Sequence, residues 1–299
     1  MSLKKLFFCF LILVLILTIA VGCGTPELDA MELIPQNANM IISIQVSRIL
    51  NDTDLIFAYN EAEKKEGQPK TIDEALDEVV RETGIDPRDI SEAVIFVDMT
   101  SIGEADYLGI IVEGNFDIKH LPGEIEEEME MDFTVSEYKG YELYVDQDEE
   151  FAITFLSDKM VLLGTAQAVK DAIDVSKGVR EKVSGAVLDT YNRFGDALIK
   201  LAFEVSGEIR RQIAEEPPGD MPISLEPFAD IETVGFALSK KLEMVTAQID
   251  SHFLSAESAE DAKDTLSGAV SFFKGVSPDQ RLKELLTLAC SAPLPQTGR

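Results

Sequence analysis

The stretch from Phe133 to Gly164, FTVSEYKGYELYVDQDEEFAITFLSDKMVLLG, decides the fold class of this chain. It contains four short apolar runs, at Phe133–Glu137, Glu142–Asp146, Phe151–Leu156 and Met160–Gly164. The first pair flanks Lys139-Gly140 and the second pair flanks Ser157-Asp158-Lys159. Short runs of β-forming residues joined by tight turns are typical of antiparallel hairpins. We therefore expect four consecutive antiparallel strands.

A helix is predicted directly after these strands. Thr165 can cap its first turn, the segment Ala166 to Lys177 carries the apolar spacing of a helix, and Gly178 is a suitable end residue. Strands followed by a helix over the same stretch indicate an α+β fold.

The segment before the hairpins combines strands with helices. Met40 to Val46 alternates like a half-buried strand, and the apolar runs Ala93–Val97 and Leu108–Val112 flank the polar turn Thr100–Asp106. Two helices are expected as well. One starts at the capping box Thr71–Glu74, places Ile72, Ala75, Leu76, Val79 and Val80 on one face and stops before Gly84 and Pro87. The other starts at Asp117 and turns Ile118, Leu121, Ile125 and Met129 inward, with the acidic residues Glu124, Glu126, Glu127, Glu128 and Glu130 outward.

The second half of the chain resembles the first. Asn37–Ile49 is similar to Gly195–Ile209, and the hairpin at Ile90–Val112 corresponds to Ile231–Ile249, with a turn at Ser239-Lys240-Lys241 and a helix at Ala259–Phe273. The fold predicted is α+β, with antiparallel sheets, helices packed on one face and two related lobes from an internal duplication. The first lobe is 36–178, and the second, abbreviated lobe is 179–289.

The N-terminus has the outline of a signal peptide. Lys4 and Lys5 precede an apolar run from Leu6 to Val21, which is slightly short for a membrane-spanning helix. The run ends in Ala20-Val21-Gly22-Cys23, which resembles the lipobox of bacterial lipoprotein precursors, although that family usually has Leu at the position of Ala20. The resemblance implies cleavage before Cys23 and a diacylglyceryl group on its sulfur. An ordinary signal peptide and an uncleaved anchor are the alternatives.

The predicted organisation is thus a signal peptide at 1–22, a lipidated tether at 23–35, the two lobes and a flexible tail at 290–299. Two acyl chains hold a protein stably on a bilayer, because each buried methylene contributes roughly 0.8 kcal/mol. We expect the body to be anchored to the lipid bilayer through acylated Cys23 and to face away from the cytoplasm.

The composition excludes some classes of partner. The formal net charge is −29, from 26 basic and 55 acidic residues, and removal of 1–22 with its two lysines would make it −31. Nucleic acid is not an expected partner, because its affinity depends on basic residues that neutralise phosphates. An acidic body is also repelled by anionic headgroups, so we expect it to stand off the membrane surface.

The sequence offers no pattern that indicates catalysis. His120 and His252 are the only histidines, and neither has a metal-ligand spacing to a second His or Cys. The acidic loop Asp146–Glu150 lacks the glycine of a helix-loop-helix calcium site, because Phe151 occupies that position. Cys290 would be the one free thiol of the lipidated form. No catalytic residue, metal site or cofactor is predicted, although glycosidase chemistry with carboxylates alone stays open.

The end of the chain carries a second resemblance, since Leu294-Pro295-Gln296-Thr297-Gly298 is similar to a sortase sorting signal. In that family an apolar stretch and a basic tail follow the signal, whereas here Arg299 follows. Attachment to a cell wall is therefore not expected.

The body loosely resembles uncharacterised duplicated domains of exported bacterial proteins, a family that implies no activity or site. The sequence therefore predicts a non-enzymatic, membrane-anchored extracytoplasmic lipoprotein that binds or scaffolds another envelope protein. The alternative is a carrier for a small or lipidic ligand, suggested by apolar strand faces.

Overall fold

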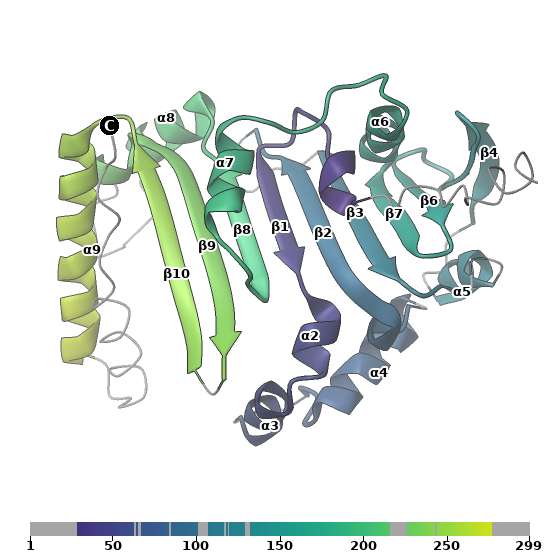
Figure 1. Ribbon diagram of the computed structural model, residues 1–299, viewed down its shortest axis with the longest axis horizontal. Helices are drawn as coiled ribbons and strands as arrows, with labels where there is room; N and C mark the ends of the chain where they lie inside the picture. Colours follow the sequence, from purple (N-terminus) through teal and green to yellow (C-terminus); the bar gives the residue numbers. More distant parts are fainter. Residues whose placement is uncertain are drawn as a thin grey trace, which may run out of the picture.

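The computed structural model describes residues 29–62, 64, 67–83, 85–100, 107–116, 118, 120–128, 132–215, 226–242 and 244–276. Its strands form one antiparallel sheet of ten strands, in the order β10-β9-β8-β1-β2-β3-β7-β6-β5-β4 (Figure 1). The strands are β1 Met40–Ile44, β2 Ile90–Asp98, β3 Tyr107–Gly114, β4 Thr134–Tyr138, β5 Tyr141–Val145, β6 Phe151–Ser157, β7 Met160–Thr165, β8 Ile199–Glu204, β9 Ile231–Lys241 and β10 Met244–Phe253.

The helices connect and flank these strands. They are η1 Ala30–Leu33, α2 Val46–Leu50, α3 Thr53–Glu61, α4 Ile72–Thr83, η2 Pro87–Asp89, α5 Leu121–Glu128, α6 Ala166–Ser176, α7 Ala186–Arg193, α8 Gly207–Glu215, η3 Glu226–Phe228 and α9 Ala256–Val276. The predicted α+β class with an antiparallel sheet is confirmed.

The hairpins predicted from local sequence are also confirmed. Lys139 and Gly140 both have positive φ, 50° and 87°, which is the geometry of a two-residue turn between β4 and β5. Thr165 caps α6 as predicted, with its hydroxyl oxygen accepting from the Ala168 N–H at 3.4 Å, and Gly178 follows the helix at φ 67°.

The capping box at the start of α4 forms in a modified way. The Thr71 hydroxyl accepts from the Glu74 N–H at 3.2 Å, as expected, but the Glu74 carboxylate accepts from the Lys70 N–H at 2.7 Å rather than from Thr71. The apolar face of α4 is only half-buried, and Val79 is 39% exposed. The first turn of this helix is thus held by hydrogen bonds, whereas its predicted apolar face is not fully buried.

Several predicted boundaries were wrong. The first helix after β3 starts at Leu121 rather than Asp117 and leaves Ile118 exposed, because Pro122 is tolerated only in the first turn of a helix. β1 ends at Ile44 rather than Val46, since Val46 is already the first residue of α2. The β9–β10 turn lies after Lys241 rather than at Ser239–Lys241, because β9 continues through those residues. Met129, Glu130 and the turn at 101–106 lie outside the described residues.

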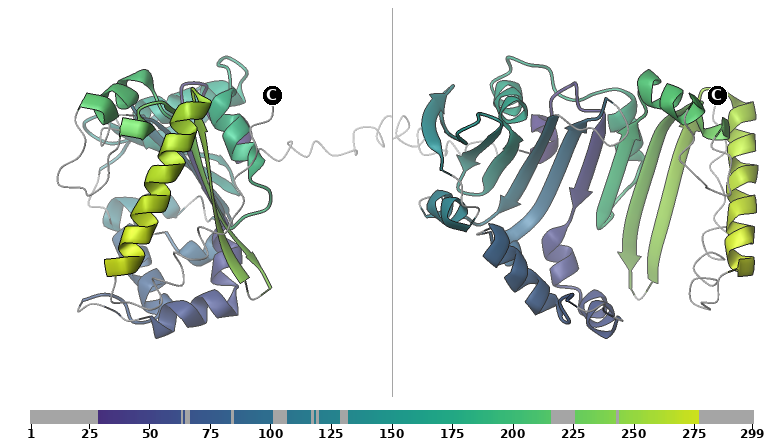
Figure 2. Two further views of the ribbon diagram at one scale, coloured as in Figure 1. Left: turned by 90° about the vertical axis from the view of Figure 1, so that its left-hand side faces the viewer. Right: turned by 180° about the vertical axis from the view of Figure 1, so that it is seen from behind.

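One face of the sheet carries the main helical layer. The helices η1, α6 and α7 pack there (Figures 1 and 2). The fully buried side chains of Ile41, Phe96, Ile111 and Ala202 belong to the same core cluster as residues of these helices. The helices are not confined to this face. Leu121 and Ile125 of α5 pack on the opposite side of β6 and β7, and Ile209 of α8 packs beside Phe203 and Val234.

The strands predicted for the two lobes share this one sheet. β1 of the first segment pairs with β8 of the second, and β1-β2-β3 and β8-β9-β10 run outward from that pair in opposite directions. This order is compatible with a repeat. The internal duplication and the division at residue 178 stay predictions.

Candidate functional site

The face of the sheet opposite α6 and α7 carries rows of apolar side chains. Residues alternate between the two faces along a strand, so the neighbours of buried Ile41, Phe96, Ile111 and Ala202 point to this second face. We call it the open face. Val97 and Val112 point to the same side but are buried, so the name does not include them. The open face comprises Ile42, Ile44, Ala93, Ile95, Ile110, Ile199, Leu201, Phe236, Leu238, Ala247 and Ile249, and none of these residues is charged.

The strand register aligns six of these residues into one row. Ile249 lies opposite Phe236, Phe236 opposite Leu201, and Leu201 opposite Ile42. On the other side, Ile42 lies opposite Ile95, which lies opposite Ile110. The row therefore crosses from β10 to β3 in a straight line, and at the usual strand spacing it is about 24 Å long.

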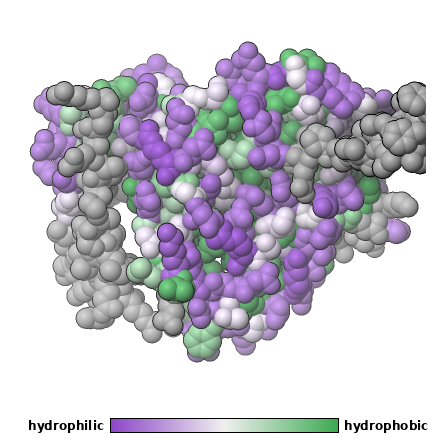
Figure 3. Space-filling view, in the orientation of Figure 1, coloured by the Kyte–Doolittle hydropathy of each residue, from purple (hydrophilic) through white to green (hydrophobic). Residues whose placement is uncertain are grey.

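These side chains are incompletely covered. Ile42, Ile95, Ile110, Leu201 and Phe236 are half-buried, whereas Ile249 is 65% exposed, and none of them belongs to a described core cluster. Seen from behind, the middle of β1, β2, β8 and β9 has no described helix in front of it (Figure 2, right). By contrast, the side with α6 and α7 presents a mainly hydrophilic surface (Figure 3).

Helices close the two ends of the open face. α5 covers Ile153 and Val161 on one side, and α8 with η3 covers Phe203 and Val234 near one end of the strands. The uncovered apolar area thus lies between these helices. Each square ångström of it that leaves water contributes about 25 cal/mol, so a bound apolar group would be stabilised there.

Charges lie at the rim of this face rather than within it. Lys240, on the same side of β9, has a side chain that is 8% exposed and donates to Asp52 at 2.5 Å and to Asp54 at 2.7 Å. These hydrogen bonds raise the pKa of Lys240, and the bond from Lys240 lowers the pKa of Asp52. The cluster joins the start of α3 to β9, so it fixes one border of the open face.

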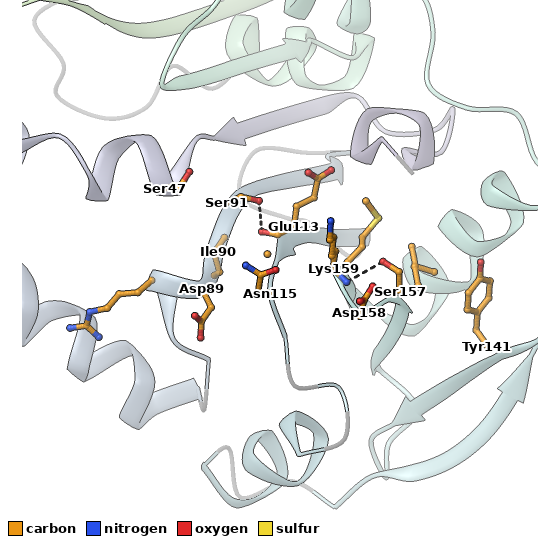
Figure 4. A pocket seen from close by; sticks show the side chains of 14 residues that line it. Ser47, Asp89, Ile90, Ser91, Glu113, Asn115, Tyr141, Ser157, Asp158 and Lys159 are labelled. Atoms are coloured by element: carbon orange, nitrogen blue, oxygen red, sulfur yellow. Dashed lines mark hydrogen bonds between the residues drawn. The ribbon is translucent and has the colours of Figure 1, made fainter. Parts of the chain in front are cut away.

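A second concave region is polar. A pocket of about 790 Å³ lies where β2 begins, β3 ends and β6 turns into β7, and Asp89, Glu113, Asn115 and Lys159 surround it (Figure 4). The Ser91 hydroxyl donates to the Glu113 carbonyl at 3.0 Å, and a Glu113 carboxylate oxygen accepts from the Ala30 N–H at 3.3 Å.

Arg88, at the edge of this pocket, is held by carboxylates of its own neighbourhood. It contacts Asp77 at 2.9 Å, Asp86 at 3.3 Å and Asp73 at 3.5 Å. The hydrogen bond to Asp77 raises the pKa of Arg88. Because Ser91, Glu113 and Arg88 are already engaged by the backbone or by neighbouring carboxylates, we consider the open face the better candidate site.

The structure does not bring the residues singled out in the sequence together. Cys23, Cys290 and Leu294–Gly298 lie outside the described residues. His120 is exposed just before α5, and His252 is exposed on β10. In the loop at Asp146–Glu150, Asp146 accepts from the Phe151 N–H at 3.0 Å, which fixes a hairpin turn.

Within the described ranges, no three His, Cys, Asp or Glu side chains are placed to hold one metal ion. The Glu126 side chain, from the acidic run, accepts from the Phe133 N–H at 3.0 Å and joins α5 to the strand that follows. Among the helices described, none combines the length and hydropathy needed to cross a membrane.

Sequence reasoning did not identify the open face as a set of residues. The alternation in Met40–Ile44 and in β9 was visible in the sequence, but the row exists only through pairings between distant strands. The signal available in the sequence was the apolar character of both faces of β1, β2 and β3, which is typical of strands covered on both sides.

Known proteins were found that are similar to this chain in sequence or in structure, but none of them indicates an activity. No family model matches the chain. The uncharacterized protein MJ0635 of Methanocaldococcus jannaschii is 33% identical over 102 residues, which is 33% of this chain and 34% of that protein. The chain thus matches about a third of the length of this relative.

Among solved structures, crystal form III of TP0453 is similar with a TM-score of 0.48 and 7% identity, over 81% of this chain and 88% of that one. Crystal form I of TP0453 has a TM-score of 0.45 and 8% identity, over 81% of this chain and 87% of that one. None of these names states a substrate, partner or activity.

Proposed function

We propose that this protein is an exported, lipid-anchored binding protein without catalytic activity, and that its ligand is a hydrocarbon chain held on the open face of the sheet. The observation that carries the proposal is the uncharged row from Ile249 to Ile110, which crosses six paired strands and stays only partly covered. The lipobox ending at Cys23 supports export and anchoring.

The chemistry of the open face favours hydrocarbon over an extended peptide. The backbone groups of β1, β2, β8 and β9 are paired within the sheet, so this face offers no backbone donor or acceptor. A peptide laid across it would keep unpaired backbone groups, which costs free energy. An alkyl chain has no such groups, and each methylene that leaves water contributes about 0.8 kcal/mol.

The size of the row also fits. The hydrocarbon core of a bilayer is about 30 Å thick, so one acyl chain reaches about 15 Å. The row is about 24 Å long at the usual strand spacing, so a full chain fits along it. An anchor at Cys23 would keep the protein beside a bilayer that contains such chains.

A fluorescent long-chain fatty acid, cis-parinaric acid, is the probe that tests ligand binding. We expect the full chain to bind it, and Leu201→Gln to weaken binding at least tenfold while the thermal midpoint of unfolding shows that the variant is folded. The matched control is Val179→Gln, because Val179 is 65% exposed and lies outside the open face. Equal affinity in wild type and Leu201→Gln would refute the proposal.

Anchoring is tested separately. Mass spectrometry of the protein from the membrane fraction should show an N-terminus that begins at a diacylated Cys23. Cys23→Ala should release the protein from the membrane or leave it unprocessed. An unmodified N-terminus, or unchanged membrane retention of Cys23→Ala, would contradict the lipoprotein assignment without bearing on ligand binding.

The second candidate function is binding of another protein, in which the body scaffolds an envelope assembly. A different feature favours it. The β9–β10 hairpin has exposed apolar side chains at Leu242, Met244 and Val245, and none of these residues belongs to the row from Ile249 to Ile110.

A further inference from the structure

Exposed apolar side chains cluster on the strand at one edge of the sheet. Among the large hydrophobic residues of the described part, Leu242 is 95% exposed, Met244 67%, Ile249 65%, Leu254 58% and Val245 48%. All five lie in β10 or directly beside it. Monomeric proteins rarely expose apolar side chains in such a cluster, and clusters of this kind mark interaction surfaces.

β10 is a long edge strand without the usual protection. It pairs with β9 along Met244–Phe253, and its other side has no strand partner in the described sheet. Edge strands are normally shortened or interrupted by Lys or Pro, and β10 contains neither. Its one acidic residue, Asp250, points inward and forms an ion pair with Arg193 at 2.9 Å.

The neighbouring helix leaves the hairpin end of this edge uncovered. α9 begins at Ala256, beside the end of β10, and diverges from the strand toward the side of the open face (Figure 2, left). The half of β10 next to the turn, which includes Val245, therefore lies farther from α9 than the half next to Phe253 does (Figure 2, left).

We propose that a second copy of this chain occupies this edge, with the two β10 strands paired antiparallel about Ala247. In that register Val245 of each copy lies opposite Ile249 of the other, and the small Ala247 meets its counterpart on the axis. Thr246 and Gln248 meet on the opposite face. Pairs of β-branched side chains stabilise antiparallel strands, so the sequence of β10 complements itself.

β10 itself adds little charge repulsion to a contact between two copies. The chain has a formal net charge of −29, which opposes contact between two copies, whereas β10 adds no unpaired carboxylate to the contact. Salt screens repulsion between the acidic bodies, so the dimer becomes tighter as ionic strength rises. Pairing also joins the open faces of the two copies, because Ile249 ends the apolar row at this edge.

Cysteine crosslinking tests the register. In full-length chain carrying Cys290→Ser, we expect Ala247→Cys to form a disulfide-linked dimer under mild oxidation, because side chains facing each other across antiparallel strands are close enough for a disulfide. Thr246→Cys and Gln248→Cys should not crosslink alone, but should crosslink when the two variants are mixed.

The oligomeric state provides the second test. Sedimentation of the detergent-solubilised full chain should show a dimer that strengthens with salt, and Ile249→Asp should make it monomeric. Val135→Asp is the control, since Val135 is 57% exposed on the opposite edge strand β4. A monomeric wild type, or a dimer that survives Ile249→Asp, overturns the proposal. The proposal is equally wrong if residues 277–299 or another protein prove to cover β10.

Discussion

Ile42 of β1 lies directly opposite Leu201 of β8, and this pair joins the two halves of the chain at the centre of the ten-stranded sheet. Both side chains are half-buried on the open face. Their neighbours Ile41 and Ala202 form the equivalent pair on the other face, where both are fully buried under the helical layer. The same two strands thus have one packed face and one face that remains accessible.

Alanine substitutions on β1 should distinguish these two faces. Ile41→Ala should destabilise the fold by about 2–5 kcal/mol, because it leaves a cavity in a packed core. Ile42→Ala removes the same atoms from a partly solvated site and should cost about 1 kcal/mol. Urea unfolding of both variants measures the difference. Equal losses would mean that the open face is packed as tightly as the core.

Gly164→Ala should be strongly destabilising. Gly164 has φ 144°, and an added Cβ would lie 2.2 Å from the carbonyl oxygen of Leu108 on the paired strand β3. The strands would have to separate, and we expect a loss of more than about 3 kcal/mol, at the upper end of overpacking costs.

Gly140→Ala is the control, because Gly140 also has a positive φ, 87°, but open space around its missing Cβ. It should cost only about 1–2 kcal/mol, the strain of the left-handed conformation. Thermal unfolding of both variants checks the order. A cost for Gly164→Ala no larger than that of Gly140→Ala would exclude the contact with Leu108 as the cause.

Asp171→Ala should disrupt a buried polar network on the helical side of the sheet. The Asp171 carboxylate accepts from Gln167 at 2.8 Å, from the Tyr107 hydroxyl at 3.0 Å and from Arg180 at 3.1 Å, and its side chain is 6% exposed. Hydrogen bonds to a charged group are worth about 1.5–3 kcal/mol each but are not additive, so we expect a total loss of about 2–4 kcal/mol.

Asp196→Ala provides the comparison for this network. Asp196 pairs with Arg48, but its side chain is 80% exposed, and exposed ion pairs contribute about 0–1 kcal/mol. Chemical denaturation should therefore separate the two variants clearly. A loss for Asp171→Ala as small as that for Asp196→Ala would show that the network does not stabilise the fold.

Glu92→Gln should stabilise the protein near neutral pH. Burial raises the pKa of the Glu92 carboxyl above its ordinary value, although Gln45 and Lys200 oppose that shift. A carboxyl with a raised folded-state pKa has no effect on stability below its unfolded pKa and becomes unfavourable as pH rises through the folded value. The denaturation midpoint of Glu92→Gln should exceed that of wild type at pH 7 and match it at pH 3.5. A midpoint below that of wild type at pH 7 would contradict this assignment.

Local sequence was a good guide wherever a structural unit is short. The four strands from Phe133 to Gly164, the cap at Thr165 and the helix after it were predicted correctly because turn residues and caps act within a few positions. The start of α5 was predicted wrongly, although Pro122 carried the signal that fixes it.

The candidate site was less accessible to sequence reasoning. The residues that the sequence singled out for chemistry, His120, His252 and Asp146–Glu150, are exposed or bind the local backbone. The residues of the open face are ordinary aliphatic side chains, and no motif distinguishes Ile42 or Leu201 from core residues. Their accessibility depends on which helices cover the sheet, and this is a property of the whole fold.

The sequence by itself determined the α+β class, the hairpins, the helix caps and the acidic, histidine-poor composition, because each follows from residues that are close in the chain or from a count of charges. Only the tertiary structure decided that β1 pairs with β8, that the strands share a single sheet, and that one apolar face stays partly uncovered. Pairing between distant strands depends on how their faces pack in three dimensions, and no local preference encodes it.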